Sequence, residues 1–194
     1  PYQGKILIDG NSFKPNSPRA AIAQGLALVP EERINQGIVP EMAVWENIIL
    51  ASLRHFIIDP ILSILNLRKS RQETIKFIQS LSIHTTGYRQ KVRYLSGGNQ
   101  QKVVLAKWLS LNARVLILDE PTRGIDVGAK AEIYKLVREL AASGTTILYI
   151  SSEIEELVGV CDRILVMRKG HLVANLHESN INFHEVLKRC YSDT

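Results

Sequence analysis

Four consecutive aliphatic residues, Val115 to Leu118, run directly into two acids, Asp119 and Glu120. An unbroken aliphatic run of this length is typical of a parallel strand that is buried on both faces. Ligands of open parallel sheets bind at the carboxyl ends of the strands, so Asp119 is placed to hold Mg²⁺ through water. Glu120 is placed to orient or deprotonate an attacking water. The alternative is a strand that simply ends in a solvated acidic turn.

Other short aliphatic runs alternate along the chain with helical patterns, and this alternation predicts a mostly parallel α/β sheet. The 194 residues fit one domain with a sizeable core. The predicted strands are Leu26–Val29, Val115–Leu118, Thr145–Ile150, Ile164–Met167 and Leu172–Leu176, and the predicted helices are Pro18–Gln24, Val127–Ala142, Glu153–Val158 and Phe183–Arg189.

The strand signal disappears between Trp45 and about Leu111, where Asn47–Arg54 and Leu67–Leu81 have helical spacing. A further helix starts near Gly97. We therefore expect an inserted α-helical subdomain. The domain would then comprise a sheet portion (1–44), the helical subdomain (45–111) and a second sheet portion (112–194).

Charge and cysteine content narrow the class of protein only a little. The net charge of +5 suits nucleic acid, anionic lipid or nucleotide phosphates, and does not choose between them. Cys161 and Cys190 have no CxxC spacing, so a reducing compartment is expected. The longest apolar stretches, such as Ile57–Leu67, are interrupted by polar residues or proline and are too short to span a membrane. Any membrane role would need a partner.

A second group of residues, Ser96-Gly97-Gly98-Asn99-Gln100, opens the helix near Gly97. Ser96 suits a helix N-cap, and the two glycines let the backbone approach a ligand closely. Free N–H groups at a helix N-terminus favour an anion. The alternative is a flexible helix start with no ligand.

The order of these groups resembles ABC ATPases. In that family Ser96–Gln100 corresponds to the signature motif, Val115–Glu120 to the Walker B strand and Asp126 to the D-loop. The strings LVPEER, LSGGNQQK, DEPTRGIDVGAK and SSEIEEL are similar to the C-terminal ATPase half of tandem proteins that energise import of ribose, galactose or xylose. The resemblance extends from about Gly4 to Cys190.

This resemblance implies a P-loop NTPase-like fold, ATP and Mg²⁺ as cofactors, and sugar-transporting ATPase activity. The implied partners are a second ABC ATPase domain with an intact phosphate loop, membrane permease subunits and, indirectly, an extracellular or periplasmic sugar-binding protein. The implied location is peripheral, on the cytoplasmic face of the membrane. DNA-repair and chromosome-organising ATPases share some of these motifs, but they carry coiled coils or zinc modules, and no heptads or CxxC pairs occur here. No nucleic-acid partner is expected.

Two positions differ from the usual ABC site. The Q-loop position holds Glu31 in place of glutamine, and the switch position holds Ser152 in place of histidine. A glutamate is repelled by a triphosphate, and a serine cannot provide the imidazole contact. Both substitutions are familiar in the second halves of sugar-importer ATPases.

The family's phosphate loop, G-x-x-G-x-G-K-[ST], does not occur in the 194 residues, and we expect the missing segment to precede them. The isolated chain is therefore predicted to be inactive. Two functions stay open: an ATPase component of a sugar importer, or a non-catalytic half that only completes a partner's ATP site or acts as an interaction or regulatory fragment.

Overall fold

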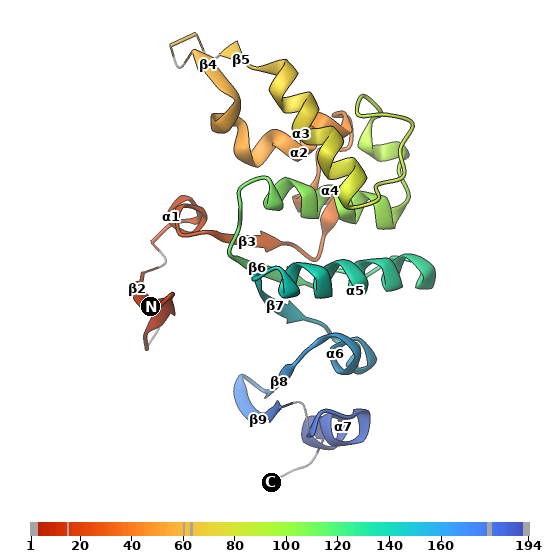
Figure 1. The fold of residues 1–194 in the computed structure, drawn as a ribbon. Coiled ribbons are helices and arrows are strands. Elements are labelled where there is room, and N and C mark those ends of the chain that lie inside the picture. The colour runs from red at the N-terminus through yellow and green to blue at the C-terminus, as the bar shows by residue number, and fades with distance from the viewer. Residues whose placement is uncertain (1–3, 15, 60, 63, 178–179, 192–194) are drawn as a thin grey trace.

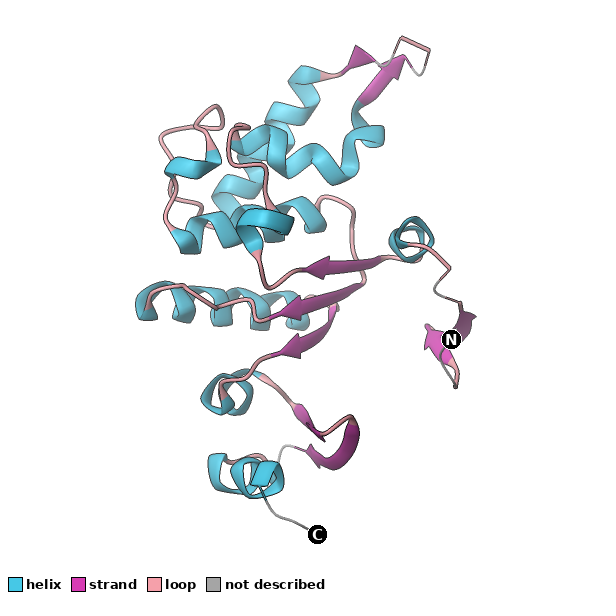
Figure 2. Cartoon of the chain, turned by 180° about the vertical axis from the view of Figure 1, so that it is seen from behind, coloured by secondary structure: helices cyan, strands magenta, loops and turns pink. Residues whose placement is uncertain are grey.

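The centre of the molecule is a three-stranded parallel sheet with the order β3-β6-β7 (Figure 2). The computed structural model describes residues 4–14, 16–59, 61–62, 64–177 and 180–191. The strands are β3 (Leu26–Val29), β6 (Val115–Asp119) and β7 (Thr146–Ile150). All three point the same way, with Val29 beside Leu118 and Asp119 beside Ile150. The predicted parallel α/β sheet is confirmed.

One face of this sheet is buried and the other is partly open. Alternate residues of β3 and β6, such as Val29 and Leu118, are fully buried in the main core. On the opposite face Leu28, Leu148 and Ile150 are 47%, 49% and 43% exposed. The expectation that the Val115–Leu118 strand is buried on both faces is therefore only half right, because the described residues cover the second face incompletely.

Helices α4 (Gly97–Leu109) and α5 (Val127–Ala142) both contribute buried side chains to the core beside the sheet. α4 lies between the sheet and the rest of the helical subdomain (Figure 1). From Gln100 to Lys107 every residue of α4 is buried. Burying a charged group is costly unless it is hydrogen-bonded, and the buried Lys107 donates to the Gly37 carbonyl.

The helical elements between β3 and β6 differ from the prediction in two ways. The first helix is shorter than the predicted Asn47–Arg54 and continues as a 3-10 helix. A short antiparallel hairpin then interrupts the helices, where no strand was expected. Asp59 explains its turn, because its carboxylate accepts hydrogen bonds from the amides of Ile61 and Leu62. The elements are α2 (Val44–Ile49), η2 (Leu50–Phe56), β4 (Ile57–Asp59), β5 (Ile64–Leu65), α3 (Leu67–Ser80) and η3 (Val92–Tyr94).

Two antiparallel hairpins lie apart from the central sheet, β1–β2 before it and β8–β9 after it in the chain (Figure 1). The turn of the C-terminal hairpin is the Lys169-Gly170 pair, in which both residues have positive φ. That hairpin packs with α7 around a second small core. The remaining elements are β1 (Ile6–Ile8), β2 (Asn11–Phe13), α1 (Pro18–Ala23), the π-helix η1 (Arg33–Gly37), α6 (Ile154–Val160), β8 (Arg163–Arg168), β9 (His171–His177) and α7 (Phe183–Tyr191).

Among the described helices, none combines the length and the apolar character that crossing a bilayer requires.

The outer edge of β7 is expected to affect the association and stability of the chain. β7 pairs only with β6, and β8 belongs to a separate sheet, so the described residues leave one edge of β7 unpaired. Unpaired edges promote association. We expect a polypeptide limited to these 194 residues to self-associate or to be marginally stable. Sedimentation and thermal unfolding at several concentrations check this, and a sharp, concentration-independent transition from a monomer would contradict it.

Candidate nucleotide site

Three of the predicted site segments meet at the carboxyl end of the central sheet. Glu31 follows β3, Asp119 and Glu120 end β6, and Ser152 follows β7. The parallel register places these three strand ends side by side. This is the edge where ligands of such sheets bind.

Glu120 is held in a strained conformation by the segment after β7. Its φ of 44° lies in the left-handed region, which non-glycine residues rarely adopt. Its amide donates to the Ile150 carbonyl at 2.9 Å, and its carboxylate accepts from the Ser152 amide at 2.7 Å. The switch position therefore orients Glu120 through its backbone, which needs no histidine side chain.

Asp119 could take part in a magnesium site only together with other ligands. The residues that the structure describes contain no group of three or more His, Cys, Asp or Glu side chains that could hold a metal ion. Mg²⁺ is usually bound by one or two carboxylates, waters and substrate phosphates. One acid at a strand end fits that pattern. The assignment of Asp119 stays a prediction.

The predicted signature segment starts a well-capped helix. Ser96 is the N-cap of α4, and its hydroxyl accepts from the Asn99 amide and from the Asn99 side chain. The side-chain oxygen Oδ1 of Asn99 in turn accepts a hydrogen bond from the backbone amide of His84 at 2.8 Å. Ser96 and Asn99 thus brace the end of the helix whose amides would face an anion.

The two glycines of this segment have different surroundings. A Cβ atom added to Gly97 would lie 2.8 Å from a guanidinium nitrogen of Arg33. A Cβ atom added to Gly98 would lie 2.6 Å from the Cβ of Ala129 on α5. The sequence suggested that both glycines serve close approach to a ligand, but Gly98 is required for packing between α4 and α5.

Arg33, which the sequence analysis missed, links three of the predicted site segments. Its guanidinium donates to the carbonyls of Arg123 and Gly124 at 2.8 and 3.2 Å, and to the side chain of Gln100 at 3.5 Å. The Gln100 amide group also donates to the Val92 carbonyl. Both ends of the Gln100 side chain are therefore already bonded inside the protein. Arg33 ends the quoted string LVPEER, but the sequence does not show its partners, which are 67 to 91 positions away.

Glu31 forms an ion pair with Arg123. Both side chains line a small pocket of about 290 Å³, together with Glu32, Arg33, Ile34 and Asn35. An exposed pair of this kind contributes little to stability. It does place a positive charge beside the carboxylate that was expected to repel a triphosphate. Arg123 lies within the quoted string DEPTRGIDVGAK, so its charge was visible in the sequence but its partner was not.

Asp126, the predicted D-loop residue, is the N-cap of α5 and accepts from the Ala129 amide at 2.9 Å. The turn before it is the one that Arg33 holds. The signature and D-loop segments are therefore in contact within the chain, since an added Gly97 Cβ would lie 3.3 Å from the Gly124 carbonyl oxygen.

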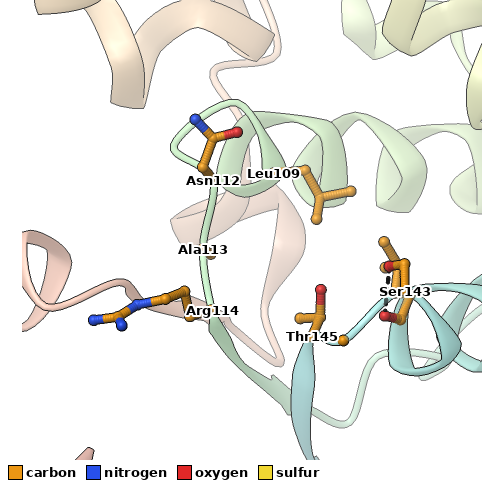
Figure 3. Close-up of a pocket in the computed structure, with 8 residues that line it drawn as sticks. Leu109, Asn112, Ala113, Arg114, Ser143 and Thr145 are labelled. Atoms are coloured by element: carbon orange, nitrogen blue, oxygen red, sulfur yellow. Dashed lines mark hydrogen bonds between the residues drawn. The ribbon is translucent and has the colours of Figure 1, made fainter. Parts of the chain in front are cut away.

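A larger pocket, of about 380 Å³, lies at the opposite end of the sheet. Figure 3 shows Leu109 and Thr145 on opposite sides of it, at the end of α4 and just before β7. Arg114 extends away from it, where it bonds to Asp9 and the Gln24 carbonyl. Because the amino ends of the strands meet here, this pocket is separate from the predicted nucleotide site.

The parallel sheet, the inserted helices and the acids at the carboxyl end of a central strand define a P-loop NTPase-like fold. The sequence profile of the family described as ABC transporter matches residues 1–123. The chain belongs to this family.

Its relatives include three sugar-import proteins. It is 44% identical to the arabinose import ATP-binding protein AraG of Rhizobium etli, 47% to the xylose import ATP-binding protein XylG of Escherichia coli and 45% to the ribose import ATP-binding protein RbsA of Pseudomonas putida. These matches cover 99%, 96% and 96% of this chain. The chain spans only 38%, 36% and 36% of those relatives, little more than a third of their length.

Two solved structures support the fold. The ATP-binding cassette MJ1267 of an ABC transporter superposes with a TM-score of 0.78 at 21% identity, covering 96% of this chain and 76% of that one. The dimeric cassette MJ0796, bound to ADP and phosphate in a post-hydrolysis state, gives 0.73 at 19% identity and covers 91% and 74%.

The contrast between the two glycines is testable. Gly98→Ala forces overpacking against Ala129 and should lower the free energy of unfolding by about 1–3 kcal/mol. Gly97→Ala should lower it by only about 1 kcal/mol, because it disturbs the hydrogen bonds of the Arg33 guanidinium, and the helix preference of alanine offsets part of that loss. Denaturant unfolding of both variants measures this, and an equal loss of stability would contradict it.

The role of Arg33 is also testable. Arg33→Lys loses the planar fork that bonds two carbonyls, so the turn at 123–126 should exchange its amide hydrogens faster. The cost in stability should be about 1 kcal/mol. Arg114→Lys is the matched control, because Arg114 also bonds a carbonyl but at the opposite end of the sheet. Unchanged exchange in Arg33→Lys, or the same change in both variants, would show that Arg33 does not hold this turn.

Proposed function

We propose that this chain is the ATP-binding component of an ABC importer for a monosaccharide, with ATP hydrolysis driving transport. The observation that carries this proposal is the identity of 44–47% to arabinose, xylose and ribose import ATP-binding proteins along almost the whole chain. A match of this kind across both the sheet and the helical subdomain supports the same energy-coupling role. The sugar does not need to touch this chain, and its identity is not part of the proposal.

In the proposed mechanism, the start of α4 caps a triphosphate that a second ABC ATPase domain holds in its phosphate loop. Amides at a helix N-terminus attract such an anion. Ser96 and Asn99 keep these amides in place, Gly97 lets the phosphate approach, and Gly98 and Gln100 fix the helix against its neighbours. The 194 residues hold no phosphate loop, so that loop comes from sequence outside them.

The acids at the strand ends have complementary roles. Asp119 would hold Mg²⁺ through water, and the bound ion would neutralise the charge of the ATP phosphates. Glu120 orients the attacking water, and Glu31, Asp126 and Ser152 occupy the Q-loop, D-loop and switch positions. The motion of closing and reopening the paired domains would be transmitted to membrane permease subunits. A sugar-binding protein would deliver the sugar to these subunits. This places the chain peripherally on the cytoplasmic face of the membrane.

A second candidate is a half that completes a partner's ATP site without hydrolysing ATP at its own acids. The ion pair between Glu31 and Arg123 favours it, because neither side chain is then free to bind a nucleotide as a Q-loop glutamine does. The serine at position 152 favours it as well.

One experiment tests the proposal and separates the two candidates. ATP turnover with Mg²⁺ is measured for the chain alone and after addition of an ABC half with an intact phosphate loop. The chain alone should be inactive. Gly97→Asp should lower turnover of the mixture by about tenfold or more, because it puts a negative charge where the triphosphate lies. Gly97→Ala controls for the added volume.

Glu120→Gln, compared with Gly97→Asp in the full-length protein that contains these residues, then identifies the acting acid. A loss of turnover in Glu120→Gln indicates hydrolysis at this half, whereas unchanged turnover together with a loss in Gly97→Asp indicates a half that only completes the partner's site. Tight ATP binding by the chain alone, or full activity of Gly97→Asp, would overturn the capping role.

A further inference from the structure

Glu156 on α6 is a buried carboxylate that neither the motifs nor the proposed mechanism use. Its side chain is only 2% exposed, and an ionised group this deep is tolerated only when its charge is fully compensated. Here the compensation comes from several elements at once. The donors to its two oxygens are Thr122 at 2.5 Å, Tyr134 at 2.7 Å, Ser151 at 2.9 Å, Lys130 at 3.0 Å and Tyr149 at 3.1 Å.

These bonds keep Glu156 ionised. Burial by itself raises the pKa of the carboxyl, but the hydrogen bonds from Thr122, Tyr134 and Lys130 outweigh it and bring the pKa down to about 2. Burial and the bond to Glu156 also raise the pKa of Tyr134 to about 12, so this phenol stays a donor at neutral pH. The ionised Glu156 carboxylate is therefore surrounded by hydroxyl donors and the ammonium group of Lys130.

The donors come from the segments that flank Glu120. Thr122 lies two residues after Glu120, in the turn that leads to Asp126. Ser151 precedes Ser152, whose amide donates to the Glu120 carboxylate at 2.7 Å. Lys130 and Tyr134 lie on α5, which begins after Asp126. One carboxylate thus joins the turn after β6, the segment after β7 and the helix after the D-loop.

We propose that Glu156 is a positioning residue, which holds the turn after β6 against the switch segment and thereby keeps the Glu120 carboxylate in its strained, oriented position. Glu156 does not touch the nucleotide; it acts through Thr122 and Ser151. The catalytic part of this inference rests on the proposed function, and the structural part does not.

The test uses the full-length protein that contains these residues, with Glu156→Gln as the variant. Glutamine keeps the shape but removes the charge and turns an N–H₂ group toward donors. Loss of a bond to a charged group should speed amide exchange in 119–124 and 150–153 by about tenfold. In the assembled transporter, kcat for ATP should fall by about tenfold or more, while KM stays within about twofold.

Two controls separate positioning from general destabilisation. Leu81→Ala removes a buried side chain of the helical subdomain and should lower the melting temperature without changing exchange in these two segments. Thr122→Ser keeps the hydroxyl donor and should behave as wild type, whereas Thr122→Val is similar in size but loses the donor and should follow Glu156→Gln. The threonine pair also provides the test if Glu156→Gln does not fold.

The outcomes of the two measurements are distinguishable. Unchanged exchange in Glu156→Gln, the same exchange change in Leu81→Ala, or no difference between the two Thr122 variants would overturn the inference. Absence of ATP turnover in the wild-type assembly would instead count against the proposed function, and the exchange measurements would still decide whether Glu156 positions Glu120.

Discussion

The pairing of β6 between β3 and β7 is the interaction on which the rest of the structure depends. Because all three strands are parallel, their carboxyl ends meet at one edge, and each end carries one of the predicted site segments. A shift of β6 by one residue would exchange its buried and exposed faces. It would also move Asp119 and Glu120 out of their present positions at the strand end. The buried aliphatic side chains of β6, which resist such a shift, therefore also determine the geometry of the site.

The loops at this edge are held by side chains rather than by further sheet pairing. Arg33 bonds the D-loop carbonyls, Lys107 bonds the Gly37 carbonyl after the Q-loop position, and Glu156 collects donors from three elements. Burial lowers the pKa of Lys107, because its charge has left water. Charged groups in such places are costly unless they are bonded, so each of these contacts strongly favours one arrangement of its loop. The site segments are thus linked to α4, α5 and α6, which also build the core.

The features that could be predicted from sequence are local ones. The β6 strand and the N-cap Ser96 each depend on a few adjacent residues, and each forms as expected. The β4–β5 hairpin was missed because its turn is made by one side chain, Asp59, within an apolar stretch. The half-open face of the sheet was missed because burial depends on what packs there and not on how apolar the strand is.

The same distinction applies to the site. The acids of β6 and the helix start at Ser96 belong to contiguous motifs, so a resemblance could locate them. Arg33 and Glu156 depend on contacts between distant segments, and neither stands out from its neighbours in sequence, since Glu156 is one of three glutamates in SSEIEEL. Only the fold shows which of those three is buried.

The two departures from the usual ABC site become understandable in this arrangement. The negative charge of Glu31 is matched by Arg123, which the same chain supplies from the turn after β6. The missing histidine at position 152 does not leave Glu120 without a partner, because a backbone amide needs no particular side chain. Both replacements move a contact that a nucleotide would otherwise make onto the protein itself. These contacts are made within the protein, and the proposed capping role would benefit from such a preformed surface, because less ordering is then needed on binding.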